Sequence, residues 1–231
     1  MNKTRIIAAI TAIALGSINS AGAVVWNGSV NFDFTLGANW DGGVAPPPNL
    51  QFSNQNVTIN AGTPLAGLVT PSFIRVGDLD VAGTLHINGP GEIRINQVNP
   101  SRITGQVAVV NGGTLSTDGG GEITLQNSGE LHITTNGRLV NRGTPLFTSS
   151  FDGMFIRDSS TLRTSGNGVS ENFGQITQTG GTNIVQDSGI MTNVNAMSDY
   201  LHDAGSIIVQ DSGRFRILGG RYVNSGGALT V

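Results

Sequence analysis

Residues 105–141 read GQVAVVNGGTLSTDGGGEITLQNSGELHITTNGRLVN, and this stretch decides the fold. Glycine recurs every eight positions, and each glycine opens a short phrase in which aliphatic side chains alternate with others. The glycines of this register are Gly105, Gly113, Gly121, Gly129 and Gly137. Because successive side chains of a β-strand point to opposite faces, each phrase predicts one short strand with one buried face.

A literal repeat downstream gives the length of one coil. The phrase IVQDSG occurs at Ile184–Gly189 and again at Ile208–Gly213, 24 residues later. Since three phrases of eight make 24, we predict an all-β, right-handed parallel β-helix (β-solenoid) with three short strands per coil. Under this rule the corner glycines stack in pairs, which are Gly105 with Gly129, Gly113 with Gly137, Gly181 with Gly205, and Gly189 with Gly213. The rule also places Ile176, Tyr200 and Tyr222 in one column.

The alternation within the phrases predicts which side chains fill the core. The inward set is Val107, Val109, Ile123, Leu125, Leu131 and Ile133, and the outward set is Glu122, Thr124, Glu130 and His132. The opening glycine is expected to turn the corner, with a positive φ where the turn requires it. Asn or Asp before the corner, as at Asn111, tolerates a left-handed conformation.

Residues 1–23 have the pattern of a secretory signal peptide. Lys3 and Arg5 precede an apolar run, and Ala21-Gly22-Ala23 is an A-x-A site that predicts cleavage after Ala23. The run is too short for a membrane span, and no second apolar stretch follows. We therefore expect an exported, extracellular or surface-located protein whose mature chain has no transmembrane anchor.

Residues 24–56 differ from the repeats and are interpreted as an N-terminal cap, ahead of a solenoid at 57–231. This segment holds both tryptophans, Trp26 and Trp40, and the proline run 46–48. A solenoid exposes an open strand edge and the end of its core, which large aromatic side chains can cover. The alternative is a binding role in which Trp26 and Trp40 stack on carbohydrate.

Between about residues 142 and 173 the glycine register is lost, and we expect an irregular excursion from the solenoid. Phe147, Phe151 and Phe155 lie four apart in this stretch. Because loops on rigid scaffolds carry function, these three phenylalanines are candidate binding residues.

Composition and residue spacing argue against several functions. The formal net charge is −3 and Lys3 is the only lysine, so no basic patch predicts nucleic-acid binding. The chain has no cysteine, and His86, His132 and His202 are not spaced as a metal site, so neither metal nor cofactor is expected. Asp187 and Asp211 stack under the 24-residue rule. We favour a pair of corner residues there over a shared cation.

The phrases GTLHI at 83–87, GEITL at 121–125 and GELHI at 129–133 resemble the repeats of secreted bacterial β-solenoids. Gln175–Thr182 and the opening Trp26…Asn39-Trp40-Asp41-Gly42-Gly43 share this resemblance. The nearest likeness is to autotransporter passenger domains and filamentous-haemagglutinin-type adhesins. The resemblance implies a right-handed β-helix displayed at the cell surface or released, often for attachment.

The sequence shows no cluster of acidic residues of the kind that acid–base catalysis needs. We therefore favour a non-enzymatic structural or adhesive protein with carbohydrate or host-surface partners. The alternatives are a polysaccharide lyase or hydrolase with its site near 142–173, and a fragment of an autotransporter passenger. Residues 226–231 end within a strand phrase, which predicts an open edge through which copies could self-associate.

Overall fold

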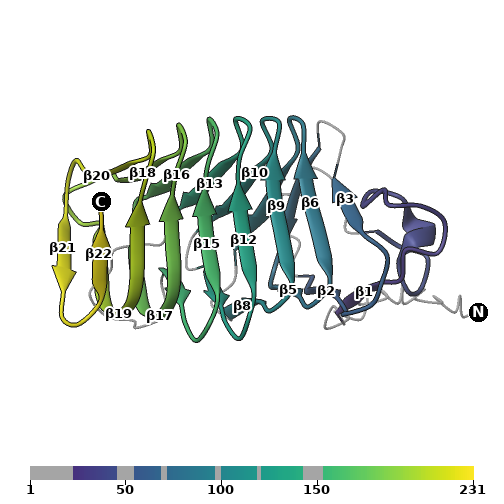
Figure 1. Cartoon of the computed structure of the whole chain (residues 1–231). Coiled ribbons are helices and arrows are strands. Elements are labelled where there is room, and N and C mark those ends of the chain that lie inside the picture. Colours follow the sequence, from purple (N-terminus) through teal and green to yellow (C-terminus); the bar gives the residue numbers. More distant parts are fainter. Residues whose placement is uncertain (1–22, 46–54, 69–71, 97–99, 119–120, 143–152) are drawn as a thin grey trace, which may run out of the picture.

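The computed structural model describes residues 23–45, 55–68, 72–96, 100–118, 121–142 and 153–231. The expected signal peptide lies outside these residues except for Ala23, as does the proline run 46–48. The chain winds into a parallel β-solenoid, with its coils stacked side by side along one axis (Figure 1). One face is a seven-stranded sheet with one strand from each coil, so seven coils are described. The two other faces are joined into one 15-stranded sheet.

All pairings between the named strands are parallel, as the sequence predicted. The seven-stranded sheet contains β4 (Phe73–Val76), β7 (Glu92–Ile95), β10 (Thr114–Thr117), β13 (Arg138–Asn141), β16 (Val169–Asn172), β18 (Ile190–Asn193) and β20 (Arg214–Ile217). One face of the larger sheet contains β1 (Val24–Trp26), β2 (Val57–Ile59), β5 (Leu79–Val81), β8 (Pro100–Ile103), β11 (Glu122–Leu125), β14 (Gly153–Ile156) and β21 (Arg221–Asn224). Its other face contains β3 (Ala66–Leu68), β6 (Thr84–Asn88), β9 (Gln106–Val110), β12 (Glu130–Ile133), β15 (Thr161–Thr164) and β22 (Ala228–Thr230). Two long strands, β17 (Gln175–Val185) and β19 (Asp199–Val209), run round the corner between these faces.

The 24-residue rule holds in two blocks of the solenoid. Residues paired in this register adjoin all four predicted glycine pairs. Ile176, Tyr200 and Tyr222 form one column, as predicted. Elsewhere the separation between stacked neighbours changes, to 22 residues early in the chain, 31 at the centre and 21 just after it. The strands stay in register because the extra or missing residues lie outside the strands.

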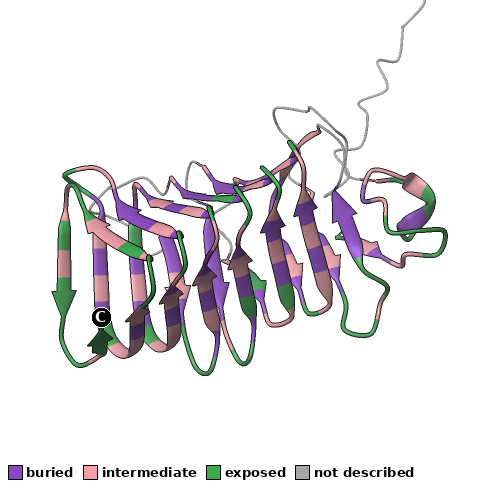
Figure 2. Cartoon of the chain, turned by 45° about the horizontal axis from the view of Figure 1, so that its top comes forward, coloured by how far each residue is buried: buried purple, intermediate pink, exposed green. Residues whose placement is uncertain are grey.

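The solenoid interior is an aliphatic core, and Figure 2 shows its buried residues running through successive coils. All six residues predicted to face inward are at most 1% exposed. Burying a side chain of this size stabilises the fold by roughly 1.5–3 kcal/mol, which one isolated coil could not convert into net stability. Stacking of neighbouring coils is therefore what makes each coil stable.

The positive φ predicted for the corner glycines is confirmed at Gly181 and Gly205, at 65° and 85°, and is wrong at Gly129. A Cβ at Gly129 would fall on the carbonyl oxygen of Ile103 in the neighbouring coil. The left-handed residue is instead Asn127, two positions earlier, at φ 59°. Asn111, Asp187 and Asp211 occupy the same position before their own glycines. At these corners Asn or Asp therefore supplies the turn, and glycine is needed because the stacked backbones approach closely.

The excursion predicted for 142–173 is wrong for residues 153–173. β14, β15 and β16 lie in this stretch and pair with the coils on both sides. The alternation was hidden because several inward positions are polar, including Ser170 and Asn172, which are 2% and 1% exposed. Residues 143–152, including Phe147 and Phe151, lie outside the described part of the chain.

An aromatic cluster covers the N-terminal end of the core. Trp26, Phe34 and Trp40 are at most 1% exposed, and the ring centroids of Phe34 and Trp40 are 4.7 Å apart. Trp26 Nε1 donates to the carbonyl of Pro64 (2.7 Å) and Trp40 Nε1 to that of Phe34 (2.9 Å). The strand β1 pairs with β2, so the segment continues the ladder as it closes the core. A short 3-10 helix, η1 (Gly37–Asn39), turns the chain back toward β1.

Candidate functional site

A shallow groove crosses the outer face of β8, β11 and β14. Its volume is about 340 Å³, and its walls are Pro100, Arg102, Glu122, Thr124, Gln126, Phe155 and Arg157. The register explains this grouping, because Arg102 pairs with Thr124 and Thr124 with Phe155 on the next strand. Neighbouring members of this row therefore stand about 4.8 Å apart on one face. The groove is at the small end of the range of about 300–1,000 Å³ found for ligand sites.

Two guanidinium groups line the groove without carboxylate partners. Among the described residues, Arg102 and Arg157 take part in no ion pair. The Arg157 guanidinium lies over the Phe155 ring, 4.6 Å from its centroid. This cation–π contact restrains the side chain. Of the three predicted phenylalanines, Phe155 thus lies at a site, as a support for Arg157.

Glu122 is the acidic side chain among the described residues that line the groove. It was predicted to face outward, and it does lie on the outer side of β11, yet it is only 4% exposed. Its Oε1 accepts a hydrogen bond from Thr124 Oγ1 at 3.0 Å. Glycoside hydrolysis generally uses two carboxyl groups, one on each side of the scissile bond. The groove's described residues provide one carboxyl group and two guanidinium groups.

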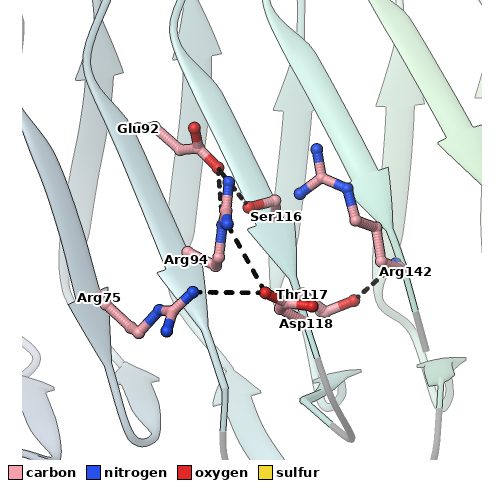
Figure 3. Close-up of polar contacts among 7 residues, drawn as sticks. All are labelled: Arg75, Glu92, Arg94, Ser116, Thr117, Asp118 and Arg142. Atoms are coloured by element: carbon pink, nitrogen blue, oxygen red, sulfur yellow. Dashed lines mark hydrogen bonds and ion pairs between the residues drawn. The ribbon is translucent and has the colours of Figure 1, made fainter. Parts of the chain in front are cut away.

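A second polar cluster spans three coils on the outer face of the seven-stranded sheet (Figure 3). Asp118 Oδ2 lies 3.4 Å from Arg75 Nη2 and 3.5 Å from Arg94 Nη1. Glu92 Oε1 accepts from Arg94 (2.8 Å) and from Ser116 (2.7 Å). Arg94 also packs on Phe73, with its guanidinium carbon 4.6 Å from the ring centroid. The positive and negative side chains pair with one another, and the cluster thereby links three neighbouring coils.

On the inner side of the same sheet, Thr117 is fully buried and links β10 to the next coil. The Arg142 backbone N–H donates to Thr117 Oγ1 at 2.9 Å, and Thr117 Oγ1 donates to Asn141 Oδ1 at the same distance. On the outer face, Arg138 pairs with Glu171 across neighbouring strands. This face therefore presents mostly neutralised charge, in contrast to the groove.

Trp26 and Trp40 are not available as a carbohydrate-stacking platform in this structure. Both rings are enclosed in the cap and both indole N–H groups are bonded to backbone carbonyls. A stacking platform needs an open ring face, which neither residue offers.

The histidines do not come together. Among the described residues, no group of three or more His, Asp or Glu side chains is placed to hold a metal ion. His86 and His132 are on the outer face and partly buried, and burial lowers the pKa of both. His202 is fully buried, and its Nδ1 lies 2.9 Å from the Tyr222 hydroxyl.

Asp187 and Asp211 lie at stacked corners with φ values of 55° and 56°. Both therefore adopt the left-handed conformation that Asp tolerates in turns. This geometry supports the interpretation as corner residues.

Sequence reasoning missed a ladder of buried asparagines beneath the seven-stranded sheet. Asn141 Nδ2 donates to Asn172 Oδ1 and Asn172 Nδ2 to Asn193 Oδ1, both at 2.8 Å. Each amide also donates to a backbone carbonyl at the next corner, such as that of Gln175 for Asn141. The available signal was the recurrence of Asn as the last residue of β13, β16 and β18.

The C-terminal coils also contain a buried polar network that the sequence did not reveal. The Tyr200 hydroxyl donates to Gln178 Oε1 (2.7 Å) and accepts from Asn183 Nδ2 (2.9 Å). Burial raises the pKa of Tyr200 far above its ordinary value of 10.0. The hydroxyl therefore stays protonated and acts as a structural link between coils.

The last described coil exposes apolar side chains at the end of the core, because Ile217 and Leu229 continue the buried columns of Asn193 and Ile207. Ile217, Leu218, Val223 and Leu229 are 37–70% exposed. Figure 2 shows the same change from buried to exposed colours in β21 and β22. Self-association through this end stays a prediction.

The fold and the groove together define a parallel β-solenoid that carries an arginine-lined groove on one outer face. The chain matches no protein-family model, and searches of curated proteins and of solved structures found no significant match. No helix among the described residues has the length and apolar character that crossing a membrane requires.

Proposed function

We propose that the protein is an exported, non-enzymatic β-solenoid that acts as a structural or adhesive element at the cell surface or outside the cell. The observation that carries the proposal is that the two sides of the strands have different roles. Inward-facing residues form the core and the asparagine ladder, while outward-facing residues are held in regular rows on a rigid frame. A rigid row of side chains binds an extended partner without paying the entropy of ordering itself.

The alternative of a carbohydrate-active enzyme is placed second. Its supporting observation is that Glu122, a shielded carboxyl group, lies in a groove with two arginines. A fragment of a longer surface protein would use the same outer faces in the same way, so the binding proposal does not depend on the full length of the polypeptide.

Two measurements test the proposal. N-terminal sequencing of protein recovered from the medium or the cell surface should begin at Val24, and retention of an uncleaved chain in the cytoplasm would contradict export. Fluorescently labelled protein should adhere to cells or to immobilised glycans without degrading them. Release of new reducing ends or unsaturated products from an acidic polysaccharide would instead favour the enzyme.

A further inference from the structure

We infer that the groove over β8, β11 and β14 is a binding site for an acidic sugar, with its anionic group held between Arg102 and Arg157. This inference rests on the proposed binding function and goes beyond it by naming the site and the chemical class of ligand. The first observation is the position of the two guanidinium groups. Arg102 lies on β8 and Arg157 directly follows the end of β14, two strands away, where the strand backbones are about 10 Å apart. Long arginine side chains from these positions can reach an oxyanion placed over Thr124.

The second observation is that the described part of the structure does not use these arginines for itself. The five ion pairs that it contains involve Arg75, Arg94, Arg138 and Arg221, and neither groove arginine is among them. Arg157 is restrained by the Phe155 ring, so little side-chain entropy remains to be lost on binding. A guanidinium presents a planar fork of donors that matches carboxylate and sulfate oxygens.

The third observation is the neutral part of the groove wall, which narrows the ligand class. Thr124 and Gln126 line the groove beside the two arginines. A ligand with one anionic group per ring, surrounded by neutral hydroxyls, matches both the charged and the neutral side chains of this wall. The Gln126 side chain, which also lines the groove, can bond such hydroxyls. Uronic acids and sparsely sulfated sugars have this chemistry.

The test measures binding by calorimetry to purified protein with four probes: trigalacturonate, a singly sulfated trisaccharide, neutral maltotriose and sodium sulfate. We expect trigalacturonate, the sulfated trisaccharide or both to bind. Comparison of the two affinities shows whether the groove recognises a carboxylate, a sulfate or either group. Maltotriose and sodium sulfate should bind at least about tenfold more weakly, since each lacks one half of the recognised chemistry. Equal affinity for maltotriose would overturn the role of the arginines, and equal affinity for sodium sulfate would overturn the sugar.

Variants assign the binding to the groove. Arg102→Gln and Arg157→Gln should each weaken the acidic sugar by about tenfold or more, the usual effect of losing a hydrogen bond to a charged group. Arg214→Gln is the matched control, because it makes the same change in net charge at an exposed position on β20. Circular dichroism establishes that each variant is folded. If Arg157→Gln unfolds, Arg157→Lys keeps the charge but loses the planar fork, and it should still weaken binding.

The outcomes separate this inference from the proposed function. Adhesion to cells that survives in both groove variants would overturn the groove as the site while leaving a surface-binding solenoid in place. Loss of affinity equal to that of Arg214→Gln would show that only net charge matters and would overturn the inference. No binding of either acidic sugar at millimolar concentration would overturn it as well.

Discussion

Replacing Asn172 by alanine tests the idea that the asparagine ladder holds the central coils together. Asn172 donates to Asn193 Oδ1 and to the Asp199 carbonyl, and it accepts from Asn141 Nδ2, at 2.8, 3.2 and 2.8 Å. Each bond is worth about 1 kcal/mol net, and Asn193 Oδ1 would lose this donor in the interior, at a cost of at least about 1 kcal/mol. We therefore expect the free energy of unfolding to fall by about 4 kcal/mol.

The assay is urea denaturation followed by circular dichroism, with amide hydrogen exchange to locate the loss. The matched control is Asn88→Ala, which removes one hydrogen bond with Asn111 at the surface and should cost about 0.5 kcal/mol or less. Exchange should accelerate first in β13, β16 and β18, because a solenoid transmits instability to nearest neighbours. If Asn172→Ala costs no more than Asn88→Ala, the ladder is not a significant source of stability and the reasoning is refuted.

Three further changes test other parts of the description. Gly129→Ala should destabilise the protein by about 2–3 kcal/mol in the same denaturation assay, because its Cβ meets the Ile103 carbonyl oxygen. The control is the adjacent, exposed Ser128→Ala, which should change stability by less than about 0.5 kcal/mol. Asp187→Ala should lower the free energy of unfolding by about 1 kcal/mol, because alanine is strained at the left-handed φ of 55°, whereas Asp187→Gly should not. A drop in melting temperature on calcium removal would indicate a cation site instead. Burial lowers the pKa of His202 below its ordinary value of 6.5. The unfolded chain therefore takes up a proton at this residue first as the pH falls, so this residue should leave stability constant above pH 6.5 and lower it below that pH. In thermal melts His202→Gln should lose less stability between about pH 7 and pH 5 than the unaltered protein, and an unchanged acid profile would contradict this.

The repeat of the fold could be predicted because its requirement is local. A corner at which two backbones approach leaves no room for a side chain, so glycine recurs wherever stacking is close, as at Gly113 and Gly137. The alternation that buries Leu131 and Ile133 is likewise contained in a few residues. These features need no knowledge of the neighbouring coil.

What could not be predicted depends on contacts between coils. Thr164, Asn172 and Asn183 are polar, and in the sequence they interrupt the aliphatic alternation. Their burial becomes favourable only because each has a hydrogen-bond partner in the interior, such as Ser170 for Thr164 and Tyr200 for Asn183. The 31-residue separation of Asn141 and Asn172 hides their pairing from a search at 24. The irregular excursion was predicted for this reason, and the structure instead continues the coils through residues 153–173.

The change in coil length also explains why the groove could not be found by periodicity. Arg102, Thr124 and Phe155 are neighbours in one row, yet the step from Arg102 to Thr124 is 22 residues and the step from Thr124 to Phe155 is 31. A row assembled from unequal steps has no fixed repeat in the sequence, whatever its role. The buried asparagine ladder, whose steps are 31 and 21, is hidden in the same way although it only stabilises stacking. The 31-residue step places the cation–π pair of Arg157 and Phe155 two strands from Arg102, with Thr124 between them, and this is the arrangement that the groove variants test.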